Sequence, residues 1–163
     1  MMTGGGRLTV AMARPIVIHN VTEARAALAA GAALGCPVTL LSAPAAGVHG
    51  GAGWFRAVVE AAVADYPTVP VTAVLDCADI PGCAQAAIRA GVRDLRFTGP
   101  PELAARLAAI AAASGVRLHD ADAFAGPRLE LRSFTDPITA CRHWLSDPDA
   151  GPQRPNTGFN PEA

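Results

Sequence analysis

The sequence predicts an α/β fold of about five mainly parallel strands alternating with helices, as an open doubly wound sheet or a partial barrel. The runs 37–43 and 69–77 are almost continuously apolar, which is typical of strands covered on both faces by helices. Strands recur roughly every 20 to 35 residues, as right-handed βα units require. The 163 residues fit one domain and are too few for an eight-unit barrel, which rarely closes below about 200 residues.

Turn and cap residues mark where each predicted helix begins and ends. Thr22 is the expected N-cap of the first helix, and Gly35, Gly91 and Gly115 are the expected stops of three helices. Pro81 opens another helix, at the position where proline is best tolerated. The expected elements, strand then helix, are 15–20 and 22–35, 37–43 and 53–66, 69–77 and 81–91, 92–99 and 100–115, and a fifth strand at 116–122.

The pattern changes after Phe124. Residues 128–134 alternate apolar and charged side chains, which predicts an additional edge strand, expected to be antiparallel. A last helix at 136–146 follows, with Asp136 as its N-cap. The expected organisation is therefore a flexible arm at 1–13, a single domain at 14–146, and a disordered tail at 147–163 that is rich in proline, glycine and polar residues.

Composition excludes several classes of function. The net charge of −1 and pI of about 6.4 offer no basic surface for nucleic acid. Glycines and prolines interrupt the uncharged run 26–48, so no membrane span is expected. Four cysteines without C-x-x-C spacing, and no apolar leader, indicate a cytoplasmic protein. All thirteen basic residues are arginine, which is typical of a GC-rich bacterial genome and excludes a lysine Schiff base.

The segment DIPGCAQAAIRAGVRDLRFTGPPELAARLAAIAAASGVRL, residues 79–118, resembles consecutive βα units of phosphate-binding (β/α)-barrel proteins. Aldolase-like and thiamine-phosphate-synthase-like proteins carry phrases of the type AIxAGVxxLxF, as in residues 87–97 here. The resemblance covers roughly residues 70–120 and concerns the fold, so it implies a partial barrel or an opened-out sheet and carries no catalytic residue.

A glycine-rich segment between the second strand and the next helix is the first candidate site. Backbone N–H groups and a helix N-terminus in such a loop are suited to an anion, usually a phosphate. The spacing is not that of a dinucleotide fingerprint, and the alternative is an ordinary surface loop. The candidate ligand-binding residues are Ser42, Gly47, His49, Gly50, Gly51, Gly53 and Arg56.

Polar residues at strand ends are the second candidate. In parallel α/β folds the carboxyl ends of the strands share one rim, where His19, Asp76 and His119 are the candidate catalytic acids and bases. Asp76 follows a buried strand, so its carboxylate must have a partner. The alternative is that these residues only mark the points where strands reach solvent. Other polar residues expected at this rim are Asn20, Cys77, Thr98 and Asp120.

Two functions remain open at this point, beside a third reading in which the chain is a divergent barrel enzyme that has kept the fold and lost its site. The first is binding of a phosphorylated or otherwise anionic small molecule at the rim, with lyase or isomerase chemistry and an undetermined cofactor. The alternative is a non-catalytic assembly domain that forms a homodimer through 128–134 and the last helix, where Ile138, Trp144 and Leu145 would make the contact. An assembly domain has no need of the glycine segment, so that segment separates the two.

Overall fold

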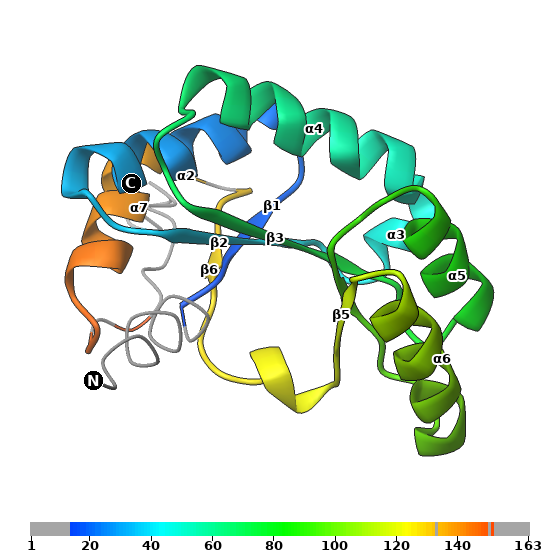
Figure 1. Cartoon of the computed structure of the whole chain (residues 1–163). Helices are drawn as coiled ribbons and strands as arrows, with labels where there is room; N and C mark the ends of the chain where they lie inside the picture. Colours follow the sequence, from blue (N-terminus) through cyan, green and yellow to red (C-terminus); the bar gives the residue numbers. More distant parts are fainter. Residues whose placement is uncertain (1–13, 133, 150, 152–163) are drawn as a thin grey trace, which may run out of the picture.

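The computed structural model describes residues 14–132, 134–149 and 151. The predicted arm at 1–13 and most of the predicted tail at 147–163 lie outside these residues. The described residues form one sheet of six parallel strands in the order β5-β4-β3-β2-β1-β6 (Figure 1). The strands are β1 (Ile16–Ile18), β2 (Val38–Ser42), β3 (Val71–Asp76), β4 (Asp94–Arg96), β5 (Arg117–His119) and β6 (Leu129–Glu130).

Helices connect the strands, as the sequence predicts. The helices are α2 (Val21–Leu34), α3 (Ala46–His49), α4 (Gly51–Asp65), α5 (Pro81–Arg89), α6 (Pro101–Ala113) and α7 (Pro137–Ser146), with a 3₁₀ turn, η1 (Asp122–Phe124), between β5 and β6. No helix in the described part of the chain is long and apolar enough to cross a membrane. The α/β class and the parallel sheet are therefore confirmed.

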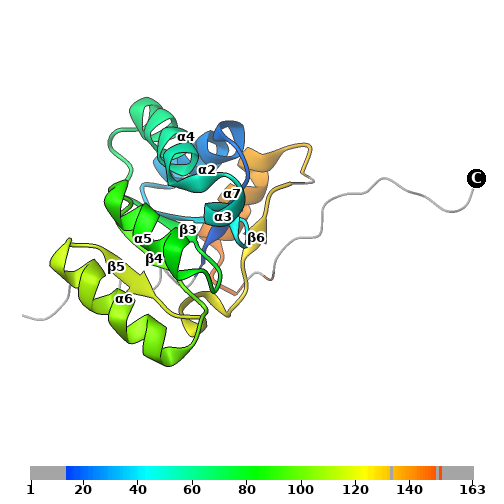
Figure 2. The same cartoon turned by 90° about the vertical axis from the view of Figure 1, so that its right-hand side faces the viewer.

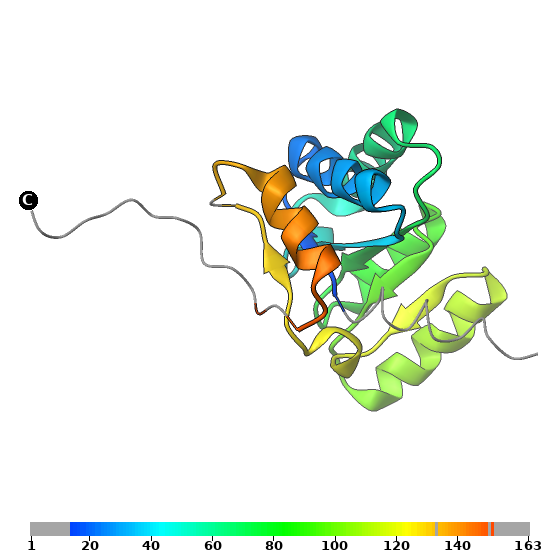
Figure 3. The same cartoon turned by 90° about the vertical axis from the view of Figure 1, so that its left-hand side faces the viewer.

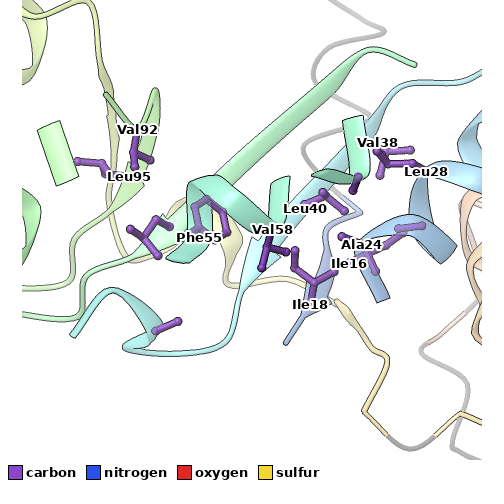
Figure 4. Close-up of a cluster of buried hydrophobic side chains, with 14 of the residues drawn as sticks. Ile16, Ile18, Ala24, Leu28, Val38, Leu40, Phe55, Val58, Val92 and Leu95 are labelled. Carbon is purple, nitrogen blue, oxygen red and sulfur yellow. The ribbon is translucent and has the colours of Figure 1, made fainter. Parts of the chain in front are cut away.

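All six helices pack on one face of the sheet. The strands direct Ile16, Ile18, Leu40, Leu75 and Leu95 into a single core with buried side chains of every helix. Phe55 and Val58 of α4 point toward the sheet in this core (Figure 4). A doubly wound sheet would carry helices on both faces, so the arrangement is that of the partial barrel.

Among the described residues, no α-helix packs on the opposite face of the sheet. Val17, Leu41 and Val74 form a small second core there with Phe124 of η1. The segment between β5 and β6, drawn in yellow in Figure 1, passes along this face. β2 and the second half of β3 are therefore buried on both faces, but the inner cover is η1, so the expectation of helices on both faces is wrong.

The edge strand β6 departs from the prediction in direction. It pairs parallel to β1, with Ile16 opposite Leu129 and Val17 opposite Glu130, so the antiparallel expectation is wrong. A parallel strand needs a crossover, which η1 and its flanking loops supply. The order β6-β1-β2-β3-β4-β5 follows a barrel wall that stays open between β5 and β6 (Figure 2).

Helix ends are predicted with mixed success. Gly35, Gly91 and Gly115 all adopt positive φ, and Asp136 accepts a hydrogen bond from the Thr139 N–H. The N-cap of α2 is Asn20, whose side chain accepts from the Glu23 N–H, so the expectation for Thr22 is wrong. Asparagine caps at least as well as threonine, and both were available in the sequence.

The last helix, α7, lies along α2 (Figure 3). Trp144 is only 2% exposed, and its indole N–H donates to the Arg14 carbonyl oxygen at 3.1 Å. The Arg14 guanidinium in turn stacks on the ring, 3.7 Å from its centroid. Trp144 therefore belongs to the chain's own core, and the prediction that it forms a dimer contact is wrong.

Candidate functional site

Asp76, at the end of β3, is the centre of a buried polar network. Asp76 is 4% exposed, and Arg96 Nη1 donates to its Oδ2 at 2.6 Å. Its backbone N–H donates to Ser42 Oγ at 2.9 Å, which ties β3 to the end of β2. The partner that the sequence required for this carboxylate is therefore Arg96, directly opposite it in the register of β3 and β4.

The same carboxylate fixes the two loops that follow β2 and β3. Asp76 Oδ1 accepts hydrogen bonds from the N–H groups of Ala45 and Ala78, both at 2.9 Å. These two alanines have φ of 58° and 50°, in the left-handed region that costs an L-residue roughly 1–2 kcal/mol. Non-glycine residues persist there when their surroundings over-determine them, and such positions cluster at functional sites.

A row of three charged or titratable side chains crosses neighbouring strands at the rim. Asp76 lies opposite Arg96, and Arg96 lies opposite His119. Neighbouring strands are about 4.8 Å apart, so the row spans roughly 10 Å. Arg96 Nη2 also donates to the Ala121 carbonyl oxygen at 3.2 Å, while its buried Nε has no hydrogen-bond partner among the described residues.

The His119 ring contacts the carboxylate of Asp94, at the start of β4. His119 Nε2 lies 2.9 Å from Asp94 Oδ1, and Arg117 binds the same carboxylate through two nitrogens at 2.8 and 2.9 Å. Burial alone would raise the pKa of Asp94, but the hydrogen bonds from His119 and Arg117 outweigh it and hold that pKa below its ordinary value. The ring of Phe124 packs edge-on against His119, with centroids 5.3 Å apart.

His19 is engaged through both ring nitrogens. Nδ1 lies 2.9 Å from Glu23 Oε2, and Nε2 lies 3.3 Å from Glu130 Oε1. The His19 backbone N–H also donates to Glu23 at 2.7 Å. His19 therefore connects the end of β1 with α2 and with β6, and neither ring nitrogen is left for a ligand in this arrangement.

The glycine-rich segment is mostly helical in place of the expected loop. Residues 46–49 form α3, and α4 begins at Gly51, two residues before the predicted start. Gly47 lies so close to β3 and α5 that a Cβ would stand 3.0 Å from the Asp76 carbonyl oxygen and 2.7 Å from Cys83 Sγ. Gly51 has φ of 79°, and the junction of the two helices turns there.

Of the remaining predicted ligand-binding residues, Ser42 contacts the row through the hydrogen bond from the Asp76 N–H, and the others lie apart from it. Ser42 is buried, and its hydroxyl donates to the Ala43 carbonyl oxygen. Gly50, Gly53 and His49 lie around the start of α4, and His49 is exposed. Arg56 lies on the helix-covered face, where its guanidinium donates to Glu60 and to the Ala90 carbonyl oxygen. In the described residues no three histidine, cysteine or acidic side chains are grouped to hold a metal ion.

Sequence reasoning did not select Arg96, Asp94 and Arg117. A signal for them exists, since DLR at 94–96 and RLH at 117–119 place two polar residues on one face of a strand and a leucine on the other. The leucines lie in or against the core under the helices. The polar residues must then face the inside of the sheet, beside Asp76.

No known protein family matches the sequence, and no curated protein resembles it significantly. The fold does have counterparts among solved structures. One is the crystal structure of a candidate fructose-1,6-biphosphate aldolase from Coccidioides immitis, with a TM-score of 0.57 and 20% sequence identity. The match covers 70% of this chain and 42% of that chain, so this protein spans less than half the length of that neighbour. At such identity the similarity shows the fold alone, and it confirms the fold-level resemblance to phosphate-binding (β/α)-barrel proteins.

Proposed function

We propose that this protein binds a phosphorylated or otherwise anionic small molecule at the carboxyl ends of β3, β4 and β5, and acts on it as a lyase or isomerase. The observation that carries the proposal is the row Asp76, Arg96 and His119. Arg96 keeps 16% of its side chain exposed, so an anion at the rim can reach its guanidinium. Its unpartnered Nε supports the same reading, because buried donors are almost always hydrogen-bonded.

His119 is the best-placed acid–base group. When Nε2 carries the proton that Asp94 accepts, Nδ1 is the free base, and Asp94 fixes the orientation of the ring. The role of Asp76 is to position Arg96 and the loops at Ala45 and Ala78. The N–H groups in the first turn of α4 provide further donors for an anion.

The chemistry is limited by the absence of lysine from the sequence. The structural neighbour from Coccidioides immitis is described as a candidate fructose-1,6-biphosphate aldolase, which makes sugar phosphates the first compounds to test. A carbon–carbon cleavage here cannot proceed through a lysine Schiff base. The negative charge that develops on the substrate would then have to be stabilised by Arg96.

The experiment is a thermal-shift and calorimetric titration with inorganic phosphate and fructose 1,6-bisphosphate. A ligand at about 100 times its dissociation constant adds roughly 2.7 kcal/mol, a shift of several degrees for a protein of this size. Arg96→Gln should remove the shift, while Arg106→Gln, on an exposed position of α6, should keep it. Binding that Arg96→Gln leaves intact contradicts the proposed site.

A second variant separates binding from chemistry. His119→Gln should bind the same ligand with little change and lose turnover, because Gln retains a donor toward Asp94 but provides no base. Retained turnover in His119→Gln would remove His119 from the mechanism without removing the binding site.

A further inference from the structure

A cleft lies on the helix-covered face of the sheet, away from the rim. It has a volume of about 590 Å³ and lies between α4 and the amino ends of β3 and β4. Its floor is apolar and is formed by Phe55, Val59, Val63, Val69, Val71, Ala73 and Val92. Small-molecule sites commonly have volumes of about 300–1,000 Å³ and mostly apolar walls.

The cleft exists because α5 is short. This helix has 9 residues, whereas α4 has 15 and α6 has 13. The first three residues of β3 are therefore only partly buried, although β3 lies inside the sheet with a strand on either side. Apolar surface of this kind gains about 25 cal/mol per Å² when it is removed from water, so a bound apolar group would be favoured.

The charges around the cleft favour an anion. Three arginines and two carboxylates line it. Arg56 is paired with Glu60, and Arg117 with Asp94. Arg93 is exposed and immediately precedes β4, two residues before Leu95, and no described residue is paired with it. One guanidinium thus remains available beside the apolar floor.

We propose that this cleft binds a small amphipathic anion, with its apolar body against the valines of α4 and β3 and its carboxylate paired with Arg93. A guanidinium recognises a carboxylate through two parallel hydrogen bonds, which gives the site orientation as well as attraction. The site lies at the opposite ends of the strands from the proposed rim site and uses neither Arg96 nor Asp76, although Asp94, which pairs with His119, and its partner Arg117 also line it.

The test compares two ligands with the same chain length, one with a charged carboxylate headgroup and one with a neutral hydroxyl. Octanoate, below its micelle concentration, and 1-octanol are titrated into the full chain by calorimetry. Arg93→Gln should weaken octanoate binding by about tenfold and leave 1-octanol binding unchanged. Ala73→Leu, which fills the cleft, should weaken both ligands, and Arg106→Gln should affect neither. Absence of saturable octanoate binding, or an unchanged affinity in Arg93→Gln, overturns the proposal.

Chemical-shift mapping on the wild-type protein provides a readout that does not depend on the folding of any variant. Octanoate should shift the amide signals of Val63, Val71 and Val92, which lie around the cleft. Shifts concentrated instead at Asp76 and His119 would place octanoate at the rim and overturn the second site. Neither result decides whether the rim binds phosphate, which the phosphate titration tests separately.

Discussion

Replacing Asp76 by asparagine tests whether the buried network holds the rim together. The amide oxygen still accepts from the N–H groups of Ala45 and Ala78, but the amide nitrogen faces Arg96 Nη1 and leaves that guanidinium without its counter-ion. Breaking a buried ion pair from one side costs about 3–5 kcal/mol. We expect about 3 kcal/mol here, because Arg96 keeps some contact with solvent.

The assay is urea and thermal unfolding followed by circular dichroism. At roughly 2–4 °C per kcal/mol for a chain of this size, Asp76→Asn should lower Tm by roughly 6–12 °C. The matched control is Asp65→Asn, since the Arg25–Asp65 pair has the same 2.6 Å distance but both side chains are about half exposed. Exposed pairs contribute about 0–1 kcal/mol, so this variant should lose at most about 4 °C. Equal losses in the two variants would refute the reasoning.

Three further predictions concern glycine, acid and thiol chemistry. Gly47→Ala should destabilise the protein, because its Cβ would press on Cys83 Sγ and on backbone, whereas Gly53→Ala, with open space around it, should add up to about 1 kcal/mol in urea unfolding. The lowered pKa of Asp94 contributes stability that is complete above its ordinary value of 3.8 and is lost as the pH falls below that value. The loss in free energy of unfolding caused by Asp94→Asn should therefore be smaller at low pH than at neutral pH. A loss that is the same at both pH values would contradict this. Burial, Cys83 and Asp76 raise the pKa of Cys77, so a maleimide should label Cys83 well before Cys77 in native protein, as measured by peptide mass spectrometry. Equal labelling of the two thiols would contradict the burial of Cys77.

The fold could be predicted because its signals are local. Apolar runs, alternation and helix stops lie within one element, and Gly35 with positive φ is an example of a residue type that dictates a backbone conformation. The direction of β6 and the single helical layer have no local signal in the sequence, because both depend on which strand each later segment pairs with. The sequence predicts a loop where the structure has α3, because this helix is one turn long and lacks any capping side chain.

The site was predicted only in part, for a related reason. Asp76 stood out because a buried carboxylate needs a partner, but its identity required the register of β3 against β4, which places residue 96 opposite residue 76. His119 was selected from its position at a strand end, and its link to Asp94 required the same knowledge one strand further on. His19 was selected by the same rule, and the structure pairs it with two glutamates.

Chemical-shift mapping of a phosphate titration tests the central claim most directly. If the rim between β3 and β5 binds anions, the amide signals that move with saturating phosphate should be those of Ala45, Ala78 and His119, together with the first turn of α4. Arg96→Gln should abolish these shifts. Shifts confined to the amino ends of the strands, or none at all at saturating phosphate, would contradict an anion site at this rim.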